Sequence, residues 1–240
     1  MPAPTITDTD ITADVGDTGD LNKDFAGTLS WNAGDFIVVM VFCASGGAND
    51  FTSITGGGLS FTQKLTANNS ASDCRVSLFT AIAPSTSSAT LTININNTGV
   101  GYGGVAWSIG GSNNLEGATA ADQAETVVMT VGLTRQFTNS LVLMALADWN
   151  AVADTTVTPE PVTGGTQRMA QTNTLQMTAF AFDWSDQGAP GLTNYGITGF
   201  TGGNFTMIAV EIPPIQPVTR FTLPNRNARR PAIFAPGLAR

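Results

Sequence analysis

The most constraining feature of this chain is a recurring β pattern. Segments rich in Val, Ile, Thr and Phe return roughly every ten to twenty residues, separated by clusters of Gly, Asn, Ser and Pro. The first group of residues favours strands and the second favours turns, whereas helix signals are nearly absent. The sequence therefore predicts an all-β fold. The expected strands are Thr5–Thr12, Phe36–Ala44, Ser60–Thr66, Arg75–Ile82, Thr90–Ile95, Val105–Ile109, Thr126–Val131, Leu141–Asp148, Gln176–Trp184, Tyr195–Thr198 and Phe205–Ile212.

The expected strands are of two kinds. Residues 176–183 alternate, so that Met177, Ala179 and Ala181 share one face with Asp183. Residues 36–42 are apolar throughout. This second pattern predicts a central strand covered on both faces, or a strand at a subunit contact.

A weak internal repeat accompanies the strands. Three pairs of segments resemble each other about 100 residues apart and in the same order: 35–42 with 139–146, 76–81 with 177–182, and 103–109 with 203–210. Two four-strand halves packed face to face, about 35–111 and 139–212, would form a jelly-roll-like antiparallel β-sandwich. The alternative is that any two β segments look alike. The sandwich itself is expected at residues 25–214 and does not depend on the duplication.

Charge is divided unevenly along the chain. From Arg220 onward there are five Arg and no acid, whereas residues 1–219 hold five basic residues and all 18 acids. Pro213-Pro214 should end the regular structure, because proline cannot continue a ladder. Residues 215–240, with four further prolines, are therefore expected to form an extended C-terminal arm.

The arm has three interpretations. We favour a docking arm that binds a partner through Arg–carboxylate pairs and small apolar anchors. The other two are a nucleic-acid contact, which the acidic body and the lack of a Lys cluster disfavour, and a free solubilising end. The candidate partner-binding residues are Arg220, Arg226, Arg229, Arg230, Ile233, Phe234, Leu238 and Arg240.

The chain contains no His, which excludes Ser-His-Asp and Cys-His catalysis. Two Cys without His cannot form a structural zinc site, and Gly56–Gly58 lacks the Lys of a phosphate-binding loop. We therefore expect no enzyme activity, no cofactor and no metal. Cys43 and Cys74 are expected to be buried thiols rather than a disulfide.

Two groups of carboxylates remain as candidates. Asp148 with Trp149, and Asp183 with Trp184, follow predicted strands, and an acid beside an aromatic residue is a sugar-binding pattern. Any strand leaving a core produces the same pattern. Two carboxylates are also what a glycosidase uses, an interpretation that we rank below sugar binding. Residues 1–24 form an acidic N-terminal segment, compatible with an edge strand. For its acids we rank a solvated face first, a partner contact second and calcium third: Asp8, Asp10, Asp14, Asp17, Asp20 and Asp24.

No secretory signal is recognisable at the start of the chain. The longest uninterrupted apolar run, Phe36–Ala44, has nine residues and is too short to cross a bilayer. We expect a soluble protein that makes no membrane contact.

Four segments carry a resemblance to a known group: Trp31–Val41, Gly58–Lys64, Val76–Ala83 and Gly104–Gly111. They are similar to β-sandwich domains of tailed-bacteriophage structural proteins and of some bacterial surface proteins. The ending Phe234–Arg240 resembles the termini of some phage virion proteins. The family often has Trp where this chain has Leu59-Ser60-Phe61. The resemblance implies a virion component, either a capsid decoration (cement) protein or a tail or fibre module.

We therefore expect a non-enzymatic virion structural protein, made in the host cytoplasm. It would form a homo-oligomer, with a trimer favoured, and stabilise the shell by bridging neighbouring subunits. Its partner would be the major capsid protein or another virion protein, and not nucleic acid. The alternative is a carbohydrate-binding tail or fibre module that uses Asp148, Trp149, Asp183 and Trp184. A glycosidase is the third candidate.

Overall fold

The computed structural model of the chain describes residues 2–15, 19–44, 51–68, 74–96, 101–113, 115–123, 128–149, 157–173, 177–199 and 205–215. These residues form strands and connections without a helix, and every strand pair is antiparallel. The predicted all-β sandwich is confirmed, whereas its jelly-roll topology stays a prediction. The last described strand ends at Ile212, before the two prolines, as expected.

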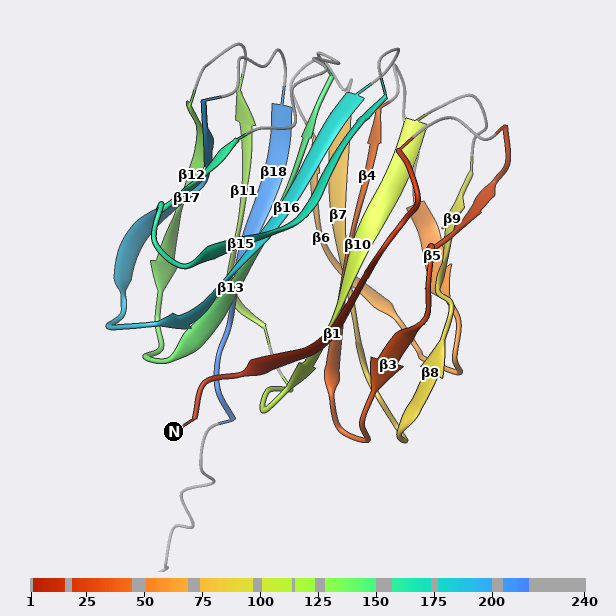
Figure 1. The fold of residues 1–240 in the computed structure, drawn as a ribbon, viewed down its shortest axis with the longest axis horizontal. Coiled ribbons are helices and arrows are strands. Elements are labelled where there is room, and N and C mark those ends of the chain that lie inside the picture. Colours follow the sequence, from red (N-terminus) through yellow and green to blue (C-terminus); the bar gives the residue numbers. More distant parts are fainter. Residues whose placement is uncertain are drawn as a thin grey trace, which may run out of the picture.

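The strands follow one another along the whole described chain (Figure 1). Their bounds are β1 Thr5–Ile11, β2 Asn22–Asp24, β3 Leu29–Trp31, β4 Phe36–Ala44, β5 Phe51–Thr55, β6 Thr62–Asn68, β7 Cys74–Ile82, β8 Ser87–Ala89, β9 Thr92–Ile95, β10 Gly101–Gly110, β11 Glu116–Gln123, β12 Val128–Arg135, β13 Ser140–Asp148, β14 Thr158–Glu160, β15 Gly165–Asn173, β16 Met177–Gln187, β17 Gly191–Thr198 and β18 Phe205–Ile212.

Two five-stranded sheets form the centre of the molecule. Their strand orders are β1-β10-β4-β7-β6 and β11-β18-β13-β16-β15. The two sheets pack face to face around one apolar cluster, to which β4 contributes Val38 and Met40 and β13 contributes Leu141 and Leu143. This cluster joins the first unit, β1 to β10, to the second unit, β11 to β18.

Smaller sheets cover the outer faces of the two central sheets. Sheets β2-β9-β5 and β3-β8 pack on the first central sheet, with Ile37 and Val39 of β4 in the shared core. Sheet β12-β17-β14 packs on the second, around Phe180 and Trp184 of β16. The described residues therefore form four layers, and β4 is buried on both faces as its continuous apolar run predicted.

The two units have the same strand order. In each, the first strand (β1 or β11) pairs with the last (β10 or β18), which pairs with the central strand (β4 or β13). The stacking is also reciprocal, because β1 contacts β15 and β11 contacts β6. The units are thus related by an approximate twofold arrangement. The three segment pairs that resemble each other in sequence lie on β4 and β13, β7 and β16, and β10 and β18.

Each outer strand of the two central sheets contains a register shift. The shifts lie at Ile6/Asp8, Gln63/Leu65, Glu116/Thr119 and Gln167/Met169. A bulge bends the strand and interrupts the ladder, which protects an edge from pairing with another sheet. At each of these bulges, a side chain can point to a different face from the one that regular strand alternation would give it.

Candidate functional site

Trp184 of the predicted sugar-binding group lies in the core. Its indole is fully buried, its Nε1 donates a hydrogen bond to the Pro161 carbonyl at 3.0 Å, and its ring packs edge-on against Tyr195 at 5.1 Å. A sugar stacks only on an exposed aromatic face. Trp184 therefore offers no stacking surface.

Asp148 and Asp183 lie far apart on the second central sheet. Asp148 pairs with Thr178, whereas Asp183 pairs with Leu143, five positions away along β13. At 3.4 Å per residue this separates the two backbone positions by about 17 Å, and the alternation of strands directs the two side chains to opposite faces. Paired glycosidase carboxylates lie about 5 to 9.5 Å apart, so this geometry does not match such a pair.

The remaining member of the group, Trp149, follows β13 and is 38% exposed. Asp148, its neighbour in the chain, is fully buried. The structure therefore does not bring the four residues together, and Trp149 is the one that presents an aromatic surface to solvent.

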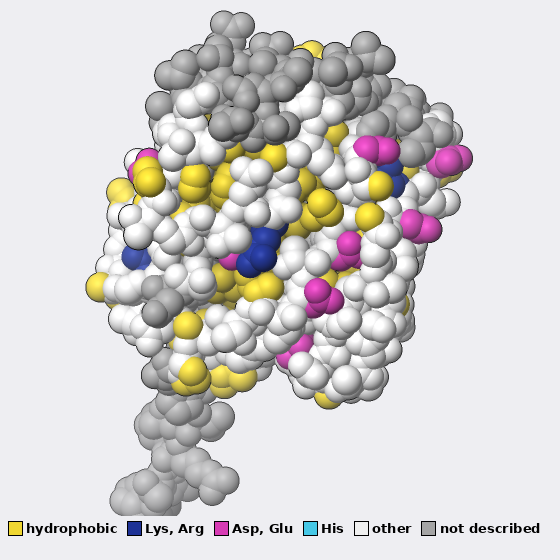
Figure 2. Space-filling model, viewed as in Figure 1, with side chains coloured by type: hydrophobic (Ala, Val, Ile, Leu, Met, Phe, Trp, Pro, Cys, Tyr) yellow, Lys and Arg dark blue, Asp and Glu magenta, His cyan; other side chains and the backbone are white. Residues whose placement is uncertain are grey.

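The acidic N-terminal segment is bonded to the strands around it. Asp8 accepts the Ser30 backbone N–H at 2.7 Å and Asp10 accepts that of Gly27 at 3.2 Å, which ties β1 to the segment around β3. Asp14 pairs with the ammonium of Lys23 at 2.8 Å. Asp17 lies outside the described residues. Figure 2 shows acidic side chains spread over the side of the molecule formed by β1 and β3.

Partial burial raises the pKa of Asp10 above its ordinary value. The N–H groups of Ile11 and Gly27 oppose this increase, and the charge of Asp8 adds to it. Among the described residues, no group of three or more His, Cys, Asp or Glu side chains is placed to hold a metal ion. The carboxylates of β1 therefore act as backbone acceptors in this structure.

The C-terminal arm begins at the junction of the two units. Pro213 and Pro214 are buried, and the Ile215 N–H donates to the Gly111 carbonyl at 2.9 Å. All eight candidate partner-binding residues of the arm lie outside the described residues: Arg220, Arg226, Arg229, Arg230, Ile233, Phe234, Leu238 and Arg240.

Described residues line two grooves at the junction of the units. The β15 groove, of about 560 Å³, runs between residues 2–6 and the edge of the second central sheet. Within it, Asp183 is nearly fully buried and accepts two hydrogen bonds from Arg168, from Nε and, at 3.2 Å, from Nη2. Asp183 thus serves as the counter-ion of Arg168.

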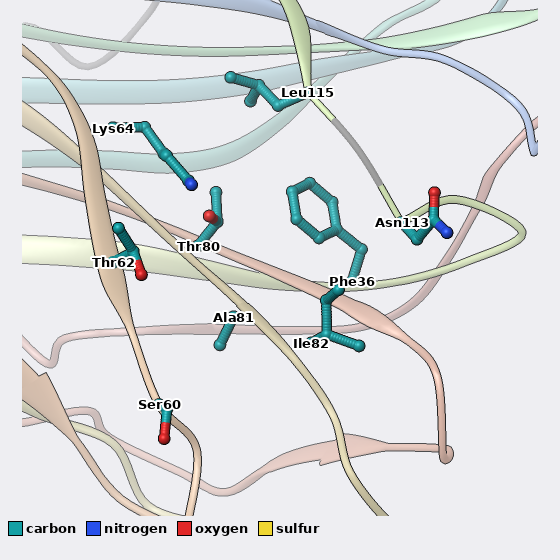
Figure 3. Close-up of a pocket in the computed structure, with 9 residues that line it drawn as sticks. All are labelled: Phe36, Ser60, Thr62, Lys64, Thr80, Ala81, Ile82, Asn113 and Leu115. Carbon is teal, nitrogen blue, oxygen red and sulfur yellow. The ribbon is translucent and has the colours of Figure 1, made fainter.

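The β6 groove, of about 480 Å³, lies at the edge of the first central sheet (Figure 3). Thr62 and Thr80 line it as a directly paired couple on β6 and β7, and the side chain of Lys64 points into it. Phe36 and Leu115 supply apolar walls. The groove thus combines one cation, hydroxyl groups and apolar surface.

The two grooves occupy corresponding places in the two units. Thr62 pairs with Thr80 as Thr166 pairs with Asp183, and Lys64 and Arg168 both lie at the register shift that follows. A sequence signal for these grooves existed, since Thr-Gln-Lys-Leu at 62–65 matches Thr-Gln-Arg-Met at 166–169. Four matching residues are too few to stand out in the sequence without the strand pairing.

Cys43 and Cys74 are buried thiols that form no disulfide, as predicted. Cys43 and Cys74 belong to cores on opposite faces of the first central sheet. In the described part of the chain, no helix has the length and apolar character needed to cross a membrane. Comparisons with family models, curated proteins and solved structures found no match to this chain.

Proposed function

We propose that this chain is a non-enzymatic structural protein of a tailed-bacteriophage virion, and that it decorates the capsid. It binds the assembled shell in preference to separated subunits, and by mass action such binding stabilises the shell. The partner is the major capsid protein or another virion protein. The decorating form is a homo-oligomer, with a trimer favoured.

The observation that carries this proposal is the division of charge between body and arm. Four of the five basic side chains in the described residues bind groups within the body: Lys23, Arg75, Arg135 and Arg168. Residues 1–219 hold 18 acids against five basic residues, and of these acids Asp35, Asp148, Asp183 and Glu211 are buried, whereas the arm carries five Arg and no acid. Guanidinium groups pair with carboxylates through two parallel hydrogen bonds, which suits the arm to an acidic surface on a neighbouring protein.

The strand order favours a jelly-roll topology within each unit, rather than the single jelly roll that the sequence predicts from two four-strand halves. In the first unit, β1, β10, β4 and β7 are neighbours in one layer, whereas β2, β9 and β5 are neighbours in the opposite layer. Successive parts of the chain thus alternate between layers, and its first and last strands pair, as in double-sheet jelly rolls, a fold that occurs in viral capsid proteins. The second unit repeats the arrangement with β11 to β18.

Binding to undecorated shells of the parent phage tests the proposal. We expect the full chain to bind and a 1–215 truncation, which keeps every described residue, to bind at least about tenfold more weakly. A full-length variant with all five arm Arg replaced by Gln separates charge from chain length. If truncated and full-length proteins bind equally, the docking role of the arm is wrong, and if neither binds, the capsid assignment is wrong.

A carbohydrate-binding tail or fibre module remains the second candidate, and the exposed ring of Trp149 favours it. A glycan array distinguishes the two functions, because a decoration protein has no need of sugar binding. Glycan binding that Trp149→Ala abolishes would support the module and count against decoration.

A further inference from the structure

Lys64 stands apart from the other basic residues of the body. Within the described residues, Lys23 pairs with Asp14, Arg168 pairs with Asp183, and the remaining two arginines bind oxygen atoms of neighbouring segments. Lys64 makes no hydrogen bond or ion pair with any of the described residues. The Lys64 side chain is exposed and points into the β6 groove, where its ammonium group is accessible to an anion from outside the body.

The β15 groove shows what the missing counter-ion would be. There, Arg168 binds the carboxylate of Asp183, which pairs with Thr166 across the β15–β16 ladder. The corresponding position in the β6 groove, opposite Thr62, is Thr80. One unit therefore carries both the cation and the carboxylate, whereas the other carries the cation and a hydroxyl group in place of the carboxylate.

We propose that the β6 groove binds the side-chain carboxylate of an acidic peptide segment in a partner protein. The carboxylate pairs with the ammonium of Lys64, which takes the place that Arg168 has in the other unit, and accepts a hydrogen bond from the Thr80 hydroxyl. An ionic hydrogen bond of this kind is stronger than one between neutral groups.

The walls of the groove favour a peptide over a small anion. Phe36, Ile82 and Leu115 line it, and Ile82 is 56% exposed although it is a large apolar side chain. An apolar residue beside the acid would cover this surface, which a free carboxylate ion would leave in water. The inference concerns the folded body and does not depend on the arm or on the proposed decoration of capsids.

Nuclear magnetic resonance titration tests the proposal with two matched peptides, Ac-Val-Asp-Val-NH2 and Ac-Val-Asn-Val-NH2. We expect the Asp peptide to shift the resonances of Lys64, Thr62 and Thr80 with a dissociation constant of about 1 mM. The Asn peptide should bind at least about tenfold more weakly, because it cannot form the ionic hydrogen bond.

Three variants of the full chain complete the experiment. Lys64→Met keeps the apolar stem and should weaken binding of the Asp peptide about tenfold. Thr80→Asp supplies an internal carboxylate, as Asp183 does in the β15 groove, and should compete with the peptide. Arg75→Met removes one positive charge elsewhere on β7 and should leave binding unchanged. Thermal unfolding of each variant reports whether it is folded.

Four outcomes would overturn the inference. They are equal binding of the two peptides, unchanged binding by Lys64→Met, equal weakening by Lys64→Met and Arg75→Met, and no shift at the groove up to about 10 mM peptide.

Discussion

The two units hold the turn before their central strand with a buried carboxylate, but the carboxylate comes from different places. In the first unit, Asp35 belongs to the turn itself, where it accepts the Asn32 N–H at 2.9 Å and the Ser108 hydroxyl at 3.2 Å. In the second unit, Glu211 of β18 reaches back and accepts the N–H groups of Gln136 and Phe137 at 2.7 and 3.0 Å.

The comparison indicates that the fold requires an acceptor at this turn but does not require it at a particular position in the sequence. Buried backbone N–H groups need an acceptor, and either arrangement supplies one. Ser108 and Glu211 lie at corresponding positions near the ends of β10 and β18. Ser108 donates its hydroxyl hydrogen to the Asp35 carboxylate, whereas Glu211 supplies the accepting carboxylate itself. The two grooves differ in the same way, with the counter-ion present in one unit only.

Substitution at these corresponding positions should give a large difference between the units. Glu211→Ala removes a fully buried carboxylate and leaves two part-buried backbone N–H groups without their charged acceptor, and should lower the free energy of unfolding by about 3 kcal/mol. Ser108→Ala removes one donor among several around Asp35, and should cost about 1 kcal/mol. Chemical denaturation measures both values, and equal losses would contradict the assigned roles.

The basic residues of the two grooves provide the second comparison. Arg168→Met leaves the nearly buried Asp183 without its cation, and should lower the free energy of unfolding by about 3 kcal/mol. Lys64→Met removes a cation that pairs with none of the described residues, so the change should stay within about 0.5 kcal/mol. If both substitutions cost the same, then Lys64 has a structural role that the groove interpretation omits.

Asp10 should give the smallest effect, and one that depends on pH. Its folded pKa is raised above the ordinary value of 3.8, so ionisation favours the unfolded chain as the pH rises from 3.8 to the folded value. Asp10→Asn keeps an acceptor for Ile11 and Gly27, and should stabilise the protein at neutral pH by less than about 0.5 kcal/mol. This gain should disappear below pH 3.8. Denaturation at several pH values checks the sign, and a gain that grows on acidification would contradict it.

The apolar strands were predicted well because the periodicity of their apolar residues indicates which faces are buried. Every predicted strand lies on an observed one, including β4 with its two buried faces. The short outer strands β2, β3, β5, β8 and β14 were missed, since three to five residues carry too little pattern. The edge strands β11 and β15 were missed because their residues are mostly polar or small and their register shifts interrupt the alternation.

The repeat shows why register could not be predicted. Sequence resemblance aligns Met40 with Met144, yet Met40 faces the junction between the units and Met144 faces the outer layer. A shift of one residue moves a side chain to the opposite face of a sheet, and apolar runs tolerate it in sequence. The four-layer arrangement was missed for a related reason, because each central sheet is apolar on both faces.

The candidate site residues failed for a different reason. Asp183 and Trp184 look like a surface pair in sequence, but adjacent positions on a buried strand point to opposite faces. Trp184 therefore enters the outer core, whereas Asp183 reaches Arg168 in the groove. Only the pairing of β15 with β16 reveals this, and it joins residues 15 positions apart in the chain.

The most direct test of the proposed capsid decoration is the temperature at which undecorated phage shells open, with and without the full-length protein. A decoration protein that binds the assembled shell alone must raise the opening temperature, and more so at higher protein concentration. We predict this increase for the full chain and its loss for the 1–215 truncation. Saturating binding without any increase in the opening temperature would contradict the proposed function.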